Sequence, residues 1–183
     1  MRSGKIGKIR RAVFLDRDGV INRCEVRNGK PYAPRRLEDF RLLPGVKNAV
    51  QALKRANFLV IVVTNQPDIG NGLIKSVTVE AMHKLINQRV QVDDIKVCPH
   101  RQDENCRCRK PKPGMLLEAA RHWKIDLSNS YMVGDRCSDV VAGQSADCYT
   151  ILINRGYREG KCPKPDRMVN SLPAAVRLIL SRR

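Results

Sequence analysis

Two carboxylates stand one residue apart, directly after a short apolar run near the start of the chain. The run covers residues 12–15, and Asp16, Asp18 and Gly19 follow it. A run of this length, rich in β-forming residues, is typical of a buried strand in a parallel sheet. Ligands of such sheets bind outside the carboxyl ends of the strands, so Asp16 and Asp18 are candidates for chemistry. The alternative is an ordinary surface turn, since Asp and Gly are common turn residues.

Two later apolar runs also end in polar side chains. Residues 58–63 are followed by Thr64 and Asn65, whose hydroxyl and amide are suited to phosphate oxygens. The same two residues could instead simply begin the next loop. Residues 131–133 are followed, after one glycine, by Asp135. The pattern of a buried strand ending in polar groups therefore occurs three times.

A cluster of metal-binding residue types lies between these runs. Cys98, His100, Cys106 and Cys108 fall within eleven residues of the chain. Three thiolates and one imidazole make a complete tetrahedral ligand set for zinc, whereas redox cysteines or coincidence are the alternatives. A full ligand set leaves no open coordination position, so we expect this zinc to be structural. It would fix a loop that leads directly into the cationic segment 109–112.

Strand-like runs alternate with segments of helical periodicity, which predicts an α/β fold. We expect a Rossmann-like parallel sheet with helices on both faces and right-handed crossovers. The expected strands are 12–15, 58–63, 95–97, 131–133 and 149–153. The expected helices cover residues 46–53, about 77–90, 116–123, a stretch through 142, and 172–180. The segment 23–40 shows no periodicity and is expected to form a loop or small flap. Glycine-containing residues 69–72 and residues 155–165 are expected to be loops, and His83 should be a packed or exposed helix residue.

Composition limits the class of protein and its partners. The chain has 183 residues, and we expect one domain over 1–183, with 1–10 as a basic tail. The net charge of +17 favours anionic ligands, while an aromatic content of 4% leaves few stacking platforms for nucleic-acid bases. We therefore expect a monomer that binds a small phosphorylated substrate rather than nucleic acid or a membrane. The basic N-terminus lacks the apolar core of a signal peptide, which indicates the cytoplasm.

A parallel sheet would bring the candidate groups together at one edge. Asp16, Thr64 and Asp135 end three strands, and Lys110 reaches the edge from the cysteine-rich loop. Neighbouring carboxylates repel each other unless a cation lies between them, and such hard oxygen ligands suit Mg²⁺. An ionised carboxylate can attack phosphorus while a lysine and a hydroxyl hold the phosphoryl oxygens. A zinc-braced nucleic-acid-binding module is the alternative class, but it has no need of these carboxylates.

These motifs resemble those of the haloacid dehalogenase superfamily of phosphatases. The matching segments occur in the family's order at 16–19, 64–66, 110 and 134–139. The cysteine–histidine loop before Lys110 is similar to that of the small capless subgroup that includes the heptose bisphosphate phosphatases and the histidinol-phosphatase domain. The resemblance covers nearly the whole chain. It implies a capless fold and a Mg²⁺-dependent phosphoric monoester hydrolase.

The resemblance also implies a role for each motif residue. Asp16 would be the nucleophile that forms an aspartyl-phosphate, and Asp18 would act first as general acid and then as general base. Mg²⁺ would be bound by Asp16, the backbone carbonyl of Asp18 and Asp135, with Asp139 in support. The remaining implied roles are phosphoryl stabilisation by Thr64 and Lys110 and substrate contact by Arg17, Asn65, Arg109 and Arg136.

The expected substrate carries a second anionic group. Arg109, Lys112 and Arg136 lie beside the predicted phosphoryl site in the sequence motifs, and arginine can grip a phosphate with two hydrogen bonds. Heptose 1,7-bisphosphate meets this requirement. Histidinol phosphate, whose amine is cationic, and a polynucleotide 3′-phosphate are the alternatives.

Overall fold

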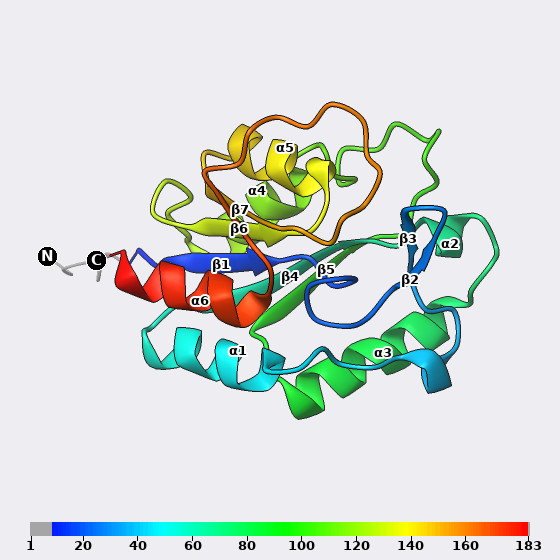
Figure 1. The fold of residues 1–183 in the computed structure, drawn as a ribbon, viewed down its shortest axis with the longest axis horizontal. Helices are drawn as coiled ribbons and strands as arrows, with labels where there is room; N and C mark the ends of the chain where they lie inside the picture. The colour runs from blue at the N-terminus through cyan, green and yellow to red at the C-terminus, as the bar shows by residue number, and fades with distance from the viewer. Residues whose placement is uncertain (1–8, 183) are drawn as a thin grey trace, which may run out of the picture.

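The computed structural model describes residues 9–182, which form a six-stranded parallel sheet covered by helices on both faces (Figure 1). The strands of this sheet are β1 (Ala12–Leu15), β4 (Leu59–Asn65), β5 (Asp94–Cys98), β6 (Tyr131–Gly134), β7 (Tyr149–Ile153) and β8 (Arg167–Val169). The helices are α1 (Val46–Arg55), α2 (Pro67–Gly70), α3 (Ser76–Arg89), α4 (Gly114–Trp123), α5 (Cys137–Ser145) and α6 (Leu172–Ser181). The strand order is β5-β4-β1-β6-β7-β8, so the predicted α/β class is confirmed.

Strand β1 lies in the middle of the sheet and is buried on both faces. Val13 and Leu15 belong to the apolar core shared with α1, α3 and α6, whereas Ala12 and Phe14 belong to the core shared with α4 and α5. Alternate residues of a strand point to opposite faces, so a strand covered on both sides must be apolar throughout. This is why the run has no polar position until it ends at Asp16.

The strand register places the candidate residues at one edge. Leu15 pairs with Val62 of β4 and with Val133 of β6, and the Asp16 amide donates to the Val133 carbonyl at 2.9 Å. The residues that follow these positions therefore emerge side by side from three adjacent strands. Within residues 9–182, no helix is long and apolar enough to cross a bilayer.

The segment after β1 contains a hairpin, where only a loop or small flap was expected. Strands β2 (Glu25–Arg27) and β3 (Lys30–Tyr32) pair antiparallel across Asn28 and Gly29, both of which have positive φ, and a 3₁₀ turn follows at Leu37–Asp39. Asn-Gly between two strands is a strong signal for a tight hairpin, so the hairpin was predictable. We refer to residues 23–39 as the flap. It stands beyond the carboxyl ends of the sheet strands, as expected (Figure 1).

Three smaller expectations are corrected. Residues 67–70 form the short helix α2 rather than a loop, with Pro67 in the first helical position that proline favours. Strand β8 was not expected, because it has only three residues and lies at the edge of the sheet. Of the expected basic tail, residues 1–8 lie outside the described residues, and Arg10 is hydrogen-bonded to Lys124 and Asp126 rather than free.

A disulfide joins two cysteines that belong to none of the sequence motifs. Cys137, at the start of α5, is bonded to Cys162 in the segment between β7 and β8. We call residues 154–166 the strap. It leaves β7, passes over α5 and returns to the edge strand β8, as the orange trace in Figure 1 shows. The bond ties the strap to the helix that follows the Asp135 motif.

Candidate active site

Asp16 and Lys110 form a buried ion pair at the end of β1. Lys110 Nζ lies 2.7 Å from Asp16 Oδ1 and 2.5 Å from Asp139 Oδ1, and none of the three residues is more than 8% exposed. Burial raises the pKa of Asp16 to about 6, although Lys110 opposes this effect. Burial alone would lower the pKa of Lys110, but the two carboxylates raise it above its usual range. The lysine is therefore a fixed cation between two carboxylates.

Asp139 orders the turn between β6 and α5. Its Oδ2 accepts hydrogen bonds from the backbone amides of Asp135 (3.1 Å) and Arg136 (3.0 Å), which is the arrangement of a capping carboxylate at a helix N-terminus. A Cβ atom at Gly134 would collide with the Asp139 side chain, so glycine is needed there. Asp139 thus aims Asp135 and pairs with Lys110, which agrees with the supporting role expected for it.

Asp135 completes a group of three buried carboxylates. One oxygen from each of Asp16, Asp135 and Asp139 lies within 4.8 Å of the others. Asp135 Oδ2 accepts a hydrogen bond of 2.9 Å from the Tyr157 hydroxyl, whereas its Oδ1 is buried without a hydrogen-bond partner. Burial and the neighbouring carboxylates raise the pKa of Asp135 well above its usual range. A buried, unpartnered carboxylate oxygen beside two further carboxylates fits a hard divalent cation such as Mg²⁺.

Asp18 is held by neutral and cationic donors. Arg17 Nη2 donates to both of its oxygens at 3.0 and 2.9 Å, Asn22 Nδ2 donates at 2.8 Å and Gln66 Nε2 at 2.7 Å. These hydrogen bonds fix the orientation of the carboxylate. The carboxylate nevertheless lines the same cleft as Asp16, so it can reach a substrate bound there.

The end of β4 contributes three polar side chains with different tasks. Thr64 is 1% exposed, and its hydroxyl accepts a hydrogen bond of 2.8 Å from Gln66, which also binds Asp18. Asn65 clasps the backbone of Lys110, since its Nδ2 donates to the Lys110 carbonyl at 2.9 Å and its Oδ1 accepts from the Lys110 amide at 3.1 Å. Both ends of this amide are therefore occupied, and we assign Asn65 to positioning Lys110 rather than to substrate contact.

The expected substrate arginines do not all lie in the cleft. Arg17 is 0% exposed, pairs with Asp18 and lies 3.3 Å from His83 Nε2, so it cannot reach a substrate and instead positions Asp18. Burial and the Arg17 charge lower the pKa of His83 to about 4, which leaves the imidazole neutral. Arg109 and Arg136 do line the cleft, together with Asp16, Asp18 and Lys110.

The three cations expected beside the phosphoryl site differ in their partners. Arg136 Nε donates to Glu159 at 2.5 Å, whereas Arg109 Nη1 is buried and has no hydrogen-bond partner. Lys112 was expected in the cleft, but it points away and binds the carbonyl and side chain of Asn105. Lys112 therefore stabilises the cysteine-rich loop. Among residues 9–182, Arg109 is the cleft arginine whose buried donor has no hydrogen-bond partner.

The four predicted zinc ligands lie close together within the cysteine-rich loop. Cys98 Sγ is 3.5 Å from Cys106 Sγ, and His100 Nδ1 is 3.2 Å from Cys108 Sγ. All four ligand atoms lie within 4.8 Å of one another, which fits a tetrahedral ion with bonds of about 2.0–2.3 Å. Because Arg109 and Lys110 follow Cys108 directly, this cluster sets where both cations enter the cleft.

Comparison with known proteins places this geometry in a family. A HAD-hydrolase-like family model matches residues 107–175. The D-glycero-beta-D-manno-heptose-1,7-bisphosphate 7-phosphatase of Pseudomonas aeruginosa is 37% identical over 161 residues, with 85% of this chain and 88% of the relative covered. The D-glycero-alpha-D-manno-heptose-1,7-bisphosphate 7-phosphatase of Campylobacter jejuni is 38% identical over 156 residues, with 82% and 86% covered. This chain belongs to the heptose bisphosphate phosphatase family of HAD-like hydrolases.

The solved structures agree with this membership. The crystal structure of D,D-heptose 1.7-bisphosphate phosphatase from B. bronchiseptica, complexed with magnesium and phosphate, superimposes with a TM-score of 0.82 at 30% identity. The superposition covers 94% of this chain and 99% of that one. As a member of this family, the chain is a phosphoric monoester hydrolase. The flap and α2 both border the cleft.

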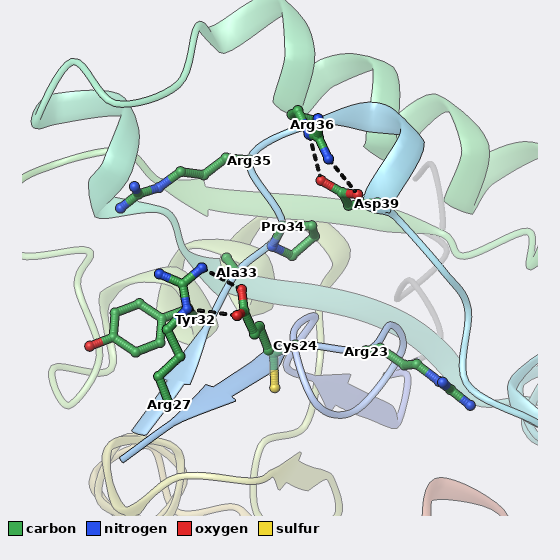
Figure 2. A pocket seen from close by; sticks show the side chains of 10 residues that line it. Arg23, Cys24, Arg27, Tyr32, Ala33, Pro34, Arg35, Arg36 and Asp39 are labelled. Atoms are coloured by element: carbon green, nitrogen blue, oxygen red, sulfur yellow. Dashed lines mark hydrogen bonds and ion pairs between the residues drawn. The ribbon is translucent and has the colours of Figure 1, made fainter. Parts of the chain in front are cut away.

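The flap of this family member carries a pocket of its own beside the catalytic cleft. The pocket has a volume of about 540 Å³, and the cleft one of about 500 Å³. Figure 2 shows Arg27 beside Tyr32, and Arg36 paired with Asp39. Arg27 also donates to Glu25 at 2.7 Å. Tyr32 and Arg35 line both the pocket and the cleft, so the two spaces are adjacent.

Three residues of the site were not predicted from the sequence. Gln66 bridges Thr64 and Asp18, and its signal was its place in the strand-end motif. Tyr157 and Glu159 lie in the strap, more than twenty positions after the motif residues they contact, Asp135 and Arg136. No local pattern marks such long-range partners, so only the structure reveals them.

Proposed function

We propose that this enzyme hydrolyses a phosphate monoester of D-glycero-D-manno-heptose 1,7-bisphosphate and releases the heptose monophosphate. Relatives at 37% and 38% identity carry that activity in their names, for the β and the α anomer respectively. The cleft supplies a carboxylate nucleophile, a second carboxylate and a lysine. The Thr64 hydroxyl lies near the end of the neighbouring strand β4. By those names, the phosphate removed is the one at position 7.

The proposed reaction has two displacement steps at phosphorus. An oxygen of Asp16 attacks the phosphorus while the bond to the sugar oxygen breaks, and Asp18 gives a proton to that oxygen. This leaves an aspartyl-phosphate and an ionised Asp18. Asp18 then removes a proton from a water molecule, which attacks the phosphorus and frees Asp16. Lys110 and Thr64 hold the phosphoryl oxygens in both steps.

Mg²⁺ is the proposed cofactor. Asp16, Asp135 and the backbone carbonyl of Asp18 would hold it, and the buried Asp135 Oδ1 without a partner fits this use. When bound, the ion supplies positive charge that neutralises the phosphoryl oxygens. Lys110 has a second buried partner in Asp139, at 2.5 Å, so its position in the cleft does not depend on Asp16 alone.

The observation that supports a bisphosphate best is Arg109. Its Nη1 is buried at the cleft without a hydrogen-bond partner, although Lys110 and Thr64 already provide for the transferring phosphoryl group. A buried donor left unpaired is costly, so a ligand with a second anionic group would stabilise it. Histidinol phosphate would bring a cationic amine instead.

Phosphate release should be compared for both anomers of heptose 1,7-bisphosphate and for histidinol phosphate. We expect a preference for a bisphosphate that shrinks by about tenfold or more in Arg109→Ala, as loss of a charged hydrogen bond predicts. Arg121→Ala is the matched control, because Arg121 is exposed on α4 and lines neither the cleft nor the flap pocket. Equal turnover of the two substrate classes by the unaltered enzyme would defeat the proposal.

We also propose that Cys98, His100, Cys106 and Cys108 bind one structural zinc ion. The four ligands fill a tetrahedral site and leave no position for substrate. Cys106→Ala should lose the zinc, lower the thermal midpoint and reduce activity indirectly, because Arg109 and Lys110 follow the loop that zinc braces. Elemental analysis of metal-replete protein, together with thermal unfolding, tests this. Protein with no zinc would contradict it, and so would a zinc-free variant of full stability.

The cytoplasmic location and the monomeric state remain predictions. Fractionation of cells, and light scattering of the purified protein, would decide the two points.

A further inference from the structure

The strap is fastened to the active site at several points along its first half. Arg155 Nε donates to the Gly19 carbonyl at 2.9 Å, and the Arg158 amide donates to the Gly29 carbonyl of the flap at 2.8 Å. Glu159 accepts from the Cys137 amide at 2.7 Å. The strap therefore contacts the loop after β1, the flap and the start of α5. Between these anchors lies Tyr157.

The Tyr157 hydroxyl contacts two groups, one in the turn before α5 and one in the flap. Its Oη donates to Asp135 Oδ2 at 2.9 Å and lies 3.0 Å from Cys24 Sγ in the flap. A phenol has a single proton, and Asp135 takes it, so the Cys24 thiol is the donor in the second contact. Gly19, at φ +81°, passes so close that a Cβ there would meet both Asp135 and the Tyr157 hydroxyl.

We propose that Tyr157 is a positioning residue that sets the affinity of the active site for Mg²⁺ by fixing the Asp135 carboxylate. The hydroxyl occupies Oδ2 and leaves Oδ1, which is buried and has no hydrogen-bond partner, as the oxygen presented to the ion. Tyr157 does not line the catalytic cleft, so it acts through Asp135 and not on the substrate. The inference rests on the Mg²⁺ site proposed above.

This arrangement differs from a tyrosine that merely fills space. A packing role would need the ring, whereas the contacts described here all belong to the hydroxyl oxygen. Removing a residue that hydrogen-bonds to a metal ligand generally lowers metal affinity or activity by about 10- to 100-fold. Tyr157→Phe deletes the hydroxyl and retains the ring, so it separates the two roles.

The test is a Mn²⁺ titration of the purified, zinc-replete protein, followed by the electron paramagnetic resonance signal of the free ion. Thiolate sites disfavour Mn²⁺, so the titration reports the carboxylate site. We expect Tyr157→Phe to raise the Kd for Mn²⁺ by about 10- to 100-fold. Activity should then recover toward the unaltered kcat as Mg²⁺ is raised, because Asp16, Asp18 and Lys110 are intact.

Two further variants serve as controls, one expected to leave Mn²⁺ binding unchanged and one expected to abolish it. Tyr149→Phe removes a hydroxyl that, within residues 9–182, is hydrogen-bonded to Arg182 and lies outside the cleft lining. This variant should bind Mn²⁺ like the unaltered protein. Asp135→Asn should lose binding that high Mg²⁺ does not restore. A Kd for Tyr157→Phe within twofold of the unaltered protein would overturn the inference, and so would a variant that fails to fold, since Tyr157 would then be structural. If the unaltered protein and Asp135→Asn bind equally, the proposed Mg²⁺ site itself is wrong.

Discussion

The edge of the sheet and the flap beside it are both held by ion pairs, but the pairs are of opposite kinds. Lys110 and Asp139 have side chains that are each 2% exposed, and their charged atoms lie 2.5 Å apart. Arg35 joins the flap to Asp68 of α2 at a similar distance, 2.7 Å, yet its side chain is 47% exposed. Distance alone would make the two pairs look equivalent.

The two pairs differ in burial, and therefore in how much each contributes to stability. Removing one partner of a buried pair leaves an uncompensated charge in a medium of low polarity, which costs about 3–5 kcal/mol. An exposed pair contributes about 0–1 kcal/mol because water and salt screen it. The buried pair therefore fixes the catalytic groups in place, whereas the Arg35–Asp68 pair adds little to the stability of the flap.

The largest effect should come from neutralising the nucleophile. Asp16→Asn is expected to lower kcat by at least about 1,000-fold, because an amide cannot form the aspartyl-phosphate. The fold should persist, since Lys110 keeps its second partner, Asp139. Steady-state phosphate release and circular dichroism check the two parts. Activity within tenfold of the unaltered enzyme would show that Asp16 is not the nucleophile.

Asp18 offers a related but milder change. Asp18→Asn should also slow turnover severely, yet it keeps the nucleophile, so a substrate with a good leaving group should leave phosphate trapped on the protein. Mass spectrometry of the quenched reaction would detect the added phosphoryl group. Its absence, with Asp16 intact, would argue against a covalent intermediate.

The next largest effect tests the buried pair directly. Asp139→Ala should lower the free energy of unfolding by about 1–3 kcal/mol, because the start of α5 loses its cap and Lys110 loses one of its two buried partners but keeps Asp16. Urea denaturation followed by circular dichroism measures it. A loss below about 1 kcal/mol would make the sheet edge no different from the flap.

Metal binding should depend on pH through the buried carboxylates. The pKa of Asp16 is raised to about 6, and the pKa of Asp135 is raised in the same direction, so protons compete with Mg²⁺ below that value. Metal binds the ionised form, and affinity therefore falls as the pH falls, by up to about tenfold per unit for one proton. Mn²⁺ titrations at several pH values between 5 and 8 would show this. A constant Kd would contradict the burial effect.

The smallest effect should come from the flap. Asp68→Ala leaves Arg35 without its partner, but both groups reach water, so the free energy of unfolding should change by less than about 1 kcal/mol. Added salt should reduce even that difference. If Asp68→Ala lost as much free energy of unfolding as Asp139→Ala, the exposed pair would stabilise the protein as much as the buried one, which would contradict this comparison.

The sequence by itself determined the central strands, their order along the chain and the polar residue types at their carboxyl ends. Apolar runs that end in Asp16, Thr64 and Asp135 were sufficient, because strand burial and strand ends are local properties of the chain. The cysteine–histidine cluster was equally local. Even the hairpin at Asn28-Gly29 has a local signal, because that dipeptide favours the positive φ angles of a tight turn.

Only the tertiary structure decided which polar groups face the substrate and which support others. Arg17 and Asn65 follow strands just as Asp16 and Thr64 do, yet one is buried against Asp18 and His83, and the other clasps Lys110. Tyr157 and the disulfide partner Cys162 approach the site from a segment without periodicity. The type of a side chain and its neighbours in sequence do not specify its long-range partners, because those partners meet only when the helices and strands pack.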